Sequence, residues 1–133
     1  MMEAAKKVFD FLEDAKTFYL ATVEGDQPRV RVYGAQLFFE DKLYLMSFAR
    51  TAAADQLKNN CKAEFCAFKG QTLRVECKLV EDPRPEVKEA MLAHMPSLKA
   101  ALGDHGENAV MWEVKDATAR FYKLMELVEE LKF

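Results

Sequence analysis

One segment, residues 71–81, constrains the fold more than any other part of this sequence, because apolar and charged residues alternate along it. The apolar positions are Leu73, Val75, Cys77 and Leu79, and the charged positions between them are Arg74, Glu76 and Lys78. Successive side chains of a β-strand point to opposite sides of a sheet, so this alternation predicts a strand with one buried and one wet side. Antiparallel sheets commonly have such a wet side. The segment therefore predicts an antiparallel sheet.

Runs rich in β-branched and aromatic residues, separated by turn signals, predict the other strands. These strands cover residues 18–23, 29–39, 43–47, 62–69, 109–115 and 117–122, the last two as a hairpin around Lys115-Asp116. Helices are predicted at residues 3–15, 52–58 (with Thr51 as its N-cap) and 85–94, with a short helix up to Gly103 and a closing helix at 123–132. In the closing segment Leu124, Leu127, Val128 and Leu131 follow the spacing of one helix face. Six or seven strands with flanking helices predict a mainly β, α+β fold, closed as an antiparallel barrel without exposed edges.

The length of 133 residues predicts a single domain over residues 1–133. A net charge of −3 argues against nucleic acid as the main partner, because neutralised phosphates supply most of the affinity for nucleic acid. No apolar run approaches the ~20 residues that cross a bilayer, and the N-terminus lacks the apolar core of a signal peptide. Three cysteines without CxxC spacing, Cys61, Cys66 and Cys77, are typical of reduced thiols. We therefore expect a small cytoplasmic protein that gains from association with a second copy.

The signatures of common enzyme sites are missing from the sequence, which has no GxGxxG, P-loop, HExxH or nucleophile-elbow motif. His94 falls in a predicted helix and His105 in a loop, and together they offer too few convergent ligands for a metal ion. We expect His94 to be a partly buried packing residue and His105 to be an exposed loop residue. No metal site is predicted.

The segment 29–57 is the candidate binding site. Arg29 and Arg31 project from one side of a predicted strand, and a predicted helix is preceded by Ser47, Arg50 and Thr51. A helix N-terminus presents unpaired backbone N–H groups and partial positive charge, which suits a phosphate, and hydroxyl and guanidinium groups add donors. Alternatively, Thr51 is only an N-cap and the arginines form surface ion pairs. Spacing alone leaves both interpretations open.

Three stretches carry a family resemblance when they are taken together. They are FYLATVEGDQPRVR at residues 18–31, KLYLMS at 42–47 followed by the helix end QLKNN at 56–60, and LRVEC at 73–77. In order and spacing they resemble the pyridoxamine 5′-phosphate oxidase-like family of FMN-binding split barrels, over about residues 3–125. The resemblance implies an antiparallel split β-barrel that forms a homodimer and holds two FMN molecules in clefts between the subunits.

The resemblance also implies roles for individual residues. The strand Arg31-Val32-Tyr33 would line the flavin, partly through backbone groups. Ser47 and the Arg50-Thr51 turn would hold the ribityl phosphate. Gln71 or Thr72 of the partner chain would reach the ring system. Trp112 would pack against the isoalloxazine or the dimer interface, or would be an ordinary barrel tryptophan.

Departures from the family's pattern bear on the expected function. Ala52 and Ala53 stand where family members commonly have Lys or Arg, and Gln36 stands where Lys is common. Each lost charge-assisted phosphate contact is worth about 1.5–3 kcal/mol. The chain also lacks the C-terminal Arg and His segment of the true oxidases, so vitamin B6 oxidation is not expected. We expect an FMN-dependent oxidoreductase with an unknown small-molecule substrate. The alternatives are a non-catalytic module that stores or senses flavin or haem, and a scaffold that has lost its ligand.

Overall fold

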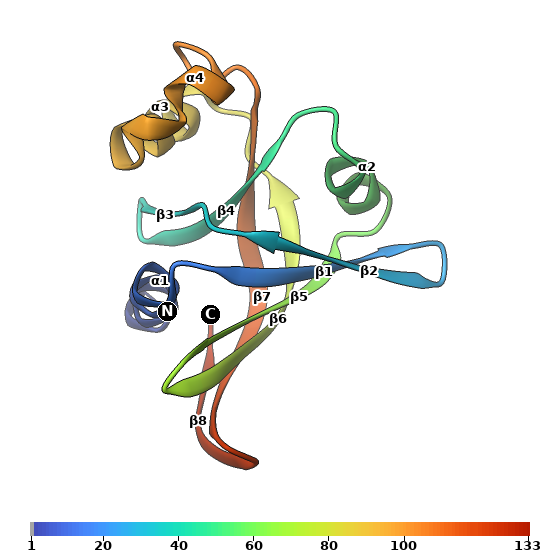
Figure 1. Cartoon of the computed structure of the whole chain (residues 1–133), viewed down its shortest axis with the longest axis vertical. Coiled ribbons are helices and arrows are strands. Elements are labelled where there is room, and N and C mark those ends of the chain that lie inside the picture. The colour runs from blue at the N-terminus through green and yellow to red at the C-terminus, as the bar shows by residue number, and fades with distance from the viewer. Residues whose placement is uncertain (1) are drawn as a thin grey trace.

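The computed structural model describes residues 2–133, which form four helices and eight strands. The helices are α1 (Met2–Ala15), α2 (Ala52–Asn59), α3 (Pro85–His94) and α4 (Lys99–Leu102), with a 3-10 turn, η1 (Pro96–Leu98), ahead of α4. The strands are β1 (Phe18–Glu24), β2 (Gln27–Tyr33), β3 (Gln36–Phe39), β4 (Lys42–Phe48), β5 (Lys62–Lys69), β6 (Gln71–Glu81), β7 (Ala109–Lys123) and β8 (Glu126–Lys132). In Figure 1 the strands cross the centre of the molecule, with α3 and α4 at its upper end and the β7–β8 hairpin at its lower end.

All eight strands belong to one antiparallel sheet in the order β2-β1-β5-β6-β7-β4-β3, with β8 paired to β7. Helix α1 packs against β3, β4 and β5, α2 packs against β1 and β4, and α3 packs against β3 and β7. The main buried cluster lies between α1, α2 and the sheet, and a second cluster lies between α3 and the β3–β4 pair. The mainly β, α+β fold is confirmed. Closure into a barrel stays a prediction, because the strand pairs of residues 2–133 form one path that ends at β2 and β3.

Several local predictions are confirmed by the structure. The alternating segment 71–81 is β6, with Leu73, Val75, Cys77 and Leu79 buried and the residues between them exposed. Thr51 is the N-cap of α2, where its Oγ1 accepts a hydrogen bond from the backbone N–H of Ala54 at 3.3 Å. Local patterns were sufficient here because each signal agrees with the packing around it.

The single long strand predicted for residues 29–39 is wrong, because the chain breaks at Gly34. β2 pairs with β1, whereas β3 leaves that pair and joins β4. Gly34 allows this change of course, since a Cβ at this position would lie 3.1 Å from the backbone oxygen of Lys16. The close approach of the two backbones therefore explains why position 34 is a glycine, which the strand pattern alone does not indicate.

The hairpin predicted around Lys115-Asp116 is also wrong, and β7 continues through it as one strand. Opposite Cys77 the ladder between β6 and β7 shifts register, so that two residues of β7 stand against one of β6. Asp116 has a φ of 49° at this point. An extra residue with this backbone geometry is a β-bulge, which bends a strand without ending it. The turn signal in the sequence therefore marks a bulge.

The closing helix predicted at residues 123–132 is wrong, and the segment is strand β8. β8 pairs antiparallel with β7 from Lys123 opposite Glu126 to Thr118 opposite Lys132. Leu131 packs against the main core, and Glu129 forms an ion pair with Lys7 of α1. The edge of β7 supplies backbone partners that outweigh the helical spacing of the leucines. With this strand the sheet has eight strands, in place of the six or seven predicted.

A polar network joins the β3–β4 turn to the segment after β6. The buried Tyr44 hydroxyl donates to Asp82 Oδ2 at 2.8 Å, and Arg84 pairs with Asp82 at 3.0 Å and with Glu40 at 2.6 Å. Burial, together with the hydrogen bond to Asp82, raises the pKa of Tyr44. The hydrogen bonds from Arg84 and Tyr44 lower the pKa of Asp82 to about 2, from its usual 3.8. Ionised Asp82 therefore stabilises the fold.

Replacing Asp82 with Asn is expected to lower stability near neutral pH and to flatten its dependence on pH in acid. Because the folded-state pKa of Asp82 is depressed, its contribution is present above about pH 4 and is lost as the pH falls towards 2. We expect the free energy of unfolding near neutral pH to fall by only about 1 kcal/mol, since solvent around Arg84 screens the ion pair. Urea denaturation between pH 7 and pH 2 measures the effect, with Asp26→Asn in the exposed β1–β2 turn as the control. An acid profile of Asp82→Asn that matches the wild type would contradict this role.

Candidate functional site

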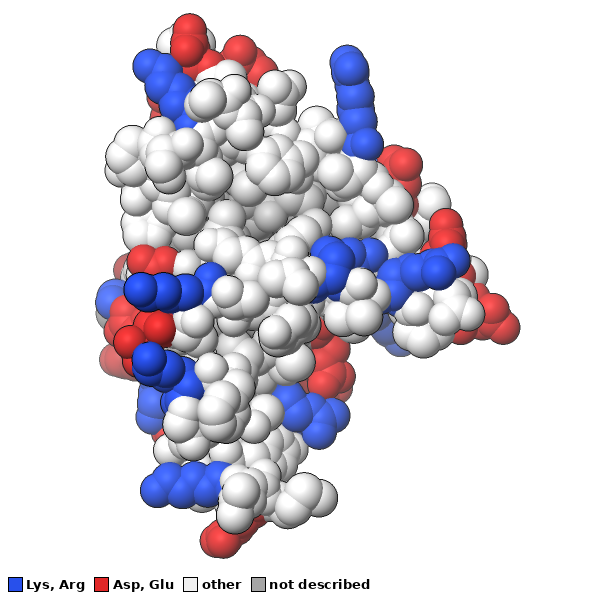
Figure 2. All heavy atoms as spheres, viewed as in Figure 1, with Lys and Arg blue, Asp and Glu red and all other residues white. Residues whose placement is uncertain are grey.

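The residues singled out from the sequence gather where β2, β4 and α2 approach one another. β2 carries Arg31 and Tyr33, β4 carries Ser47 near its end, and Arg50 follows in the loop before α2. Figure 2, viewed from the same side as Figure 1, shows an uncharged hollow above β2, between α2 and the α3–α4 end.

A buried hydrogen bond joins Trp112 on β7 to Ser47 on β4. Trp112 Nε1 donates to Ser47 Oγ at 2.8 Å, and both side chains are almost completely buried. The indole N–H is a donor only, so Ser47 accepts from Trp112. The Ser47 hydroxyl is also one of the groups that lower the pKa of Tyr33. The Tyr33 hydroxyl donates no hydrogen bond within residues 2–133, so its hydrogen is open to another acceptor.

The environment of Tyr33 keeps that hydrogen in place at neutral pH. Burial raises the pKa of Tyr33, and the charge of Arg31 and the hydrogen bond from Ser47 only partly offset the effect. A neutral, half-buried tyrosine hydroxyl is a donor for a polar atom of a ligand. Ser47, which is held by Trp112, is a polar side chain that acts on the Tyr33 hydroxyl.

A second cluster lies between β1, β2 and α2. Arg31 donates to the backbone oxygen of Leu20 at 3.1 Å, to Thr22 Oγ1 at 2.8 Å and to Gln56 Oε1 at 2.8 Å. Thr22 Oγ1 also donates to Gln56 Oε1 at 2.5 Å. Thr22 and Gln56 are buried and bonded to each other, and Arg31 gives each of their oxygens a further hydrogen-bond donor. In the described chain the guanidinium of Arg31 is a brace between β2 and α2.

Thr22 and Gln56 were missed in the sequence. Thr22 falls on the inward side of the 18–23 alternation, and Gln56 lies next to Leu57 on the buried side of α2. The signal available in the sequence was a polar residue at an inward-facing position of each element. Such a residue needs a hydrogen-bond partner, but the pattern does not identify Arg31 as that partner.

The loop between β4 and α2 has the geometry of an anion site. Arg50 is exposed, has a φ of 63°, and forms no ion pair within residues 2–133. It directly precedes Thr51, whose hydroxyl donates to the backbone oxygen of Phe48 at 2.9 Å and caps Ala54. The N–H groups of Ala52 and Ala53, in the first turn of α2, have no partner inside the helix. These two N–H groups and Arg50 are the donors that the loop offers to an anion.

The remaining candidate residues lie apart from these clusters. Arg29 is exposed and pairs with Glu24 at 2.8 Å, which agrees with the surface ion-pair interpretation. Val32 points to the opposite side of β2 from Tyr33. Gln71, at the β5–β6 turn, lines a separate cavity of about 650 Å³ beside α1 and the β7–β8 hairpin.

Gln36 occupies a buried position between β3, α1 and α3. Its Nε2 donates to Glu13, which also pairs with His94 Nε2 at 3.1 Å. Its Oε1 is buried and has no hydrogen-bond partner among residues 2–133. The His94 ring packs against Phe9 in a tilted arrangement, with 5.5 Å between the ring centroids, although the residue as a whole is exposed. His105 is exposed and pairs with Glu89 at 2.8 Å, which confirms its loop position.

Other kinds of site find no support in the described residues. No group of three or more potential metal ligands occurs within residues 2–133. No helix of that same stretch is long and apolar enough to cross a membrane. Cys61, Cys66 and Cys77 are all free thiols, and burial raises the pKa of Cys77 to about 12, which keeps that thiol protonated.

Comparison with known proteins identifies similar solved structures. No protein-family model matches the chain, and no curated protein matches it. A NimC/NimA family protein from Clostridium acetobutylicum is 33% identical over 99% of this chain and 92% of its own, with a TM-score of 0.89. General Stress Protein 26 from Bacillus anthracis str. Sterne is 17% identical over 99% and 98% of the two chains, with a TM-score of 0.73. A pyridoxamine 5′-phosphate oxidase-related, FMN-binding protein from Nostoc punctiforme is 18% identical over 98% and 93%, with a TM-score of 0.60.

Proposed function

This chain belongs to the NimC/NimA family and to the wider pyridoxamine 5′-phosphate oxidase-like proteins, and on that premise we propose that it is an FMN-binding oxidoreductase acting on a small molecule. We further propose that it works as a homodimer with FMN between the subunits. The Nostoc punctiforme relative is described as FMN-binding, which supports the choice of cofactor. The single observation that carries the proposal is Arg50, held exposed at a positive φ directly before the open N-terminus of α2.

The residues present fit the phosphate of FMN. A non-glycine residue with positive φ is costly, and such positions gather at ligand sites. Arg50 supplies a guanidinium without a competing carboxylate in the described chain, and Ala52 and Ala53 supply backbone N–H groups. The Thr51 hydroxyl hydrogen and three of the five Arg31 N–H groups are already used in internal hydrogen bonds, so these residues mainly shape the loop and brace α2. Phosphate binding would therefore depend on Arg50 more than on any other side chain.

Tyr33 offers a polar contact to a flat ring. It has a hydroxyl hydrogen, and the neighbouring Ser47 is held in place by the buried hydrogen bond from Trp112. When bound, FMN supplies hydride or electron transfer, and the protein supplies binding and orientation. Tyr33 would hold an acceptor atom of the ring or of the substrate. No protein acid or base is needed for this part of the proposal.

The test is the colour and the redox behaviour of the purified protein. We expect a yellow protein that releases FMN when denatured, and bound flavin that is bleached by NADH or NADPH and restored by an electron acceptor. A yellow protein that no donor bleaches would support the storage alternative. A colourless protein that does not bind added FMN would refute the flavin proposal.

A further inference from the structure

The cavity between α1 and the ends of the β5–β6 and β7–β8 hairpins, called the hairpin cavity below, combines an aromatic wall with basic side chains. Its volume of about 650 Å³ is typical of small-molecule sites. Phe11 of α1 and Phe121 of β7 meet here edge to face, with 5.5 Å between the ring centroids. Phe11 is only partly buried, and Val128 of β8 is 44% exposed. The hairpin cavity therefore offers an apolar wall to the body of a ligand.

Strand pairing places three polar side chains of the hairpin cavity in one row. Lys69 of β5 pairs with Gln71 of β6, and the pairing of Thr72 with Tyr122 puts Lys123 of β7 beside Gln71 on its other side. Neighbouring strands lie about 4.8 Å apart, so the backbones of the two lysines are about 10 Å apart. Lysine side chains are long and flexible, so both ammonium groups can reach one anion that is held over Gln71.

The lysines of this row are available to an anion. Lys69 and Lys123 are exposed, and neither forms an ion pair with any residue from 2 to 133. The third lysine of the hairpin cavity, Lys7, is paired with Glu129. Among the described lining residues, three lysines stand against two carboxylates, those of Glu129 and Asp14. The hairpin cavity therefore carries a net positive charge.

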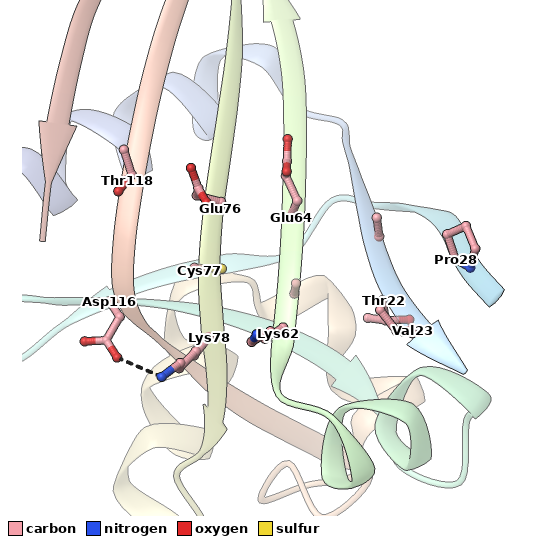
Figure 3. Close-up of a pocket in the computed structure, with 12 residues that line it drawn as sticks. Thr22, Val23, Pro28, Lys62, Glu64, Glu76, Cys77, Lys78, Asp116 and Thr118 are labelled. Atoms are coloured by element: carbon pink, nitrogen blue, oxygen red, sulfur yellow. Dashed lines mark ion pairs between the residues drawn. The ribbon is translucent and has the colours of Figure 1, made fainter. Parts of the chain in front are cut away.

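A cavity on the outward side of β5 and β6 has the opposite balance of charge. It is shown in Figure 3 and has a volume of about 450 Å³. Its lysines, Lys62 and Lys78, lie among three carboxylates, those of Glu64, Glu76 and Asp116, and its described lining includes no aromatic side chain. This second cavity does not suit an anion with an aromatic body, whereas the hairpin cavity does.

We propose that the hairpin cavity binds a small aromatic carboxylate. The aromatic ring packs against Phe11 and Val128, because aromatic rings favour edge-to-face and offset contacts with one another. The carboxylate lies between the ammonium groups of Lys69 and Lys123, which supply charge-assisted hydrogen bonds. The side-chain amide of Gln71 donates a further hydrogen bond to the same carboxylate. Ring and charge together distinguish this ligand from a simple inorganic anion.

The hairpin cavity is separate from the candidate cofactor site. The cofactor site is built from β2, β4 and the loop before α2, whereas the hairpin cavity is built from α1 and the two hairpins. Binding of the carboxylate therefore does not require FMN. The proposal goes beyond the proposed function and can fail or succeed independently of it.

The first test is isothermal titration calorimetry with 2-naphthoate. We expect one molecule to bind per chain, and about tenfold weaker binding in each of Lys69→Glu and Lys123→Glu, because each change removes a charge-assisted contact. The neutral analogue 2-naphthylmethanol should bind the wild type about tenfold more weakly for the same reason. Lys58→Glu in α2 is the matched control, since Lys58 is an exposed lysine outside the hairpin cavity. Equal affinity for the acid and the alcohol, or unchanged affinity in both cavity variants, would overturn the proposal.

The second test locates the ligand and separates it from flavin. Val128→Trp fills the exposed wall and is expected to block binding of 2-naphthoate, with unchanged circular dichroism. In NMR spectra of the wild type, 2-naphthoate should shift the amide signals of Gly70 and Lys123 but not that of Ala52. Saturating FMN should leave the affinity for 2-naphthoate unchanged. Displacement by FMN, or shifts confined to the region of Ala52, would overturn the hairpin site and leave the flavin proposal standing. A protein that binds 2-naphthoate but not FMN would refute only the cofactor.

Discussion

Replacing Trp112 with Ala is expected to lower the free energy of unfolding by about 3–5 kcal/mol, a large share of the total stability of a domain this size. Trp112 is 2% exposed and lies among the main core residues on β7. Truncation opens a cavity and also leaves the buried Ser47 hydroxyl without its donor. Urea denaturation followed by circular dichroism measures the loss. A loss below about 1 kcal/mol would contradict the central position of this side chain.

Trp112→Phe separates the hydrogen bond from the volume. Phe fills most of the same space but has no N–H, so we expect a smaller loss of about 1–2 kcal/mol. In the proposed FMN complex, the same variant should shift the flavin absorbance, because Ser47, which acts on the Tyr33 hydroxyl, would lose its hydrogen-bond donor. A large loss of stability without any change in the flavin spectrum would assign Trp112 to the core alone.

Replacing Arg50 with Ala is expected to weaken FMN binding by about ten- to a hundredfold, which corresponds to about 1.5–3 kcal/mol for one charge-assisted contact. Arg50 is exposed and has no ion-pair partner within the described residues, so its removal should leave the fold unchanged. Fluorescence titration of the apoprotein with FMN measures the change. Riboflavin, which lacks the phosphate, should bind the wild type and the variant equally.

Arg50→Gly provides a matched control at the same position. The φ of 63° is strained for arginine and free for glycine, so this variant should be at least as stable as the wild type while it loses the same affinity. Arg29→Ala provides the second control, because Arg29 is paired with Glu24 at a distance from the loop. If Arg29→Ala weakens binding and both Arg50 variants do not, the phosphate site lies elsewhere.

Elements whose local pattern agrees with their packing could be predicted from the sequence. β6 alternates because one side is buried, and Thr51 caps α2 because its hydroxyl meets an unpaired N–H group. The errors fall where a distant segment decides the outcome. The strand breaks at Gly34 where the backbone of Lys16 comes close. The segment around Leu131 is a strand because the edge of β7 is free to pair with it. No window of neighbouring residues contains that information.

The candidate site shows the same division. Arg50 and Thr51 lie side by side in the sequence, and a loop followed by a helix was sufficient to mark them. The brace between Arg31, Thr22 and Gln56 draws on three elements, so spacing along the chain could not reveal it. Trp112 and Ser47 are 65 positions apart and meet only because β4 pairs with β7. What a residue does at this site depends on strand order.

The place of β2 at the edge of the sheet has a thermodynamic consequence. In the proposed homodimer FMN would lie between the subunits beside this strand, so each docked subunit would complete the site for the cofactor. Occupancy of the site and assembly are then linked reciprocally, and each should strengthen the other by the same factor. By mass action, diluting the protein would release cofactor even at a fixed excess of free cofactor. The apparent affinity for the cofactor would then depend on the concentration of the protein.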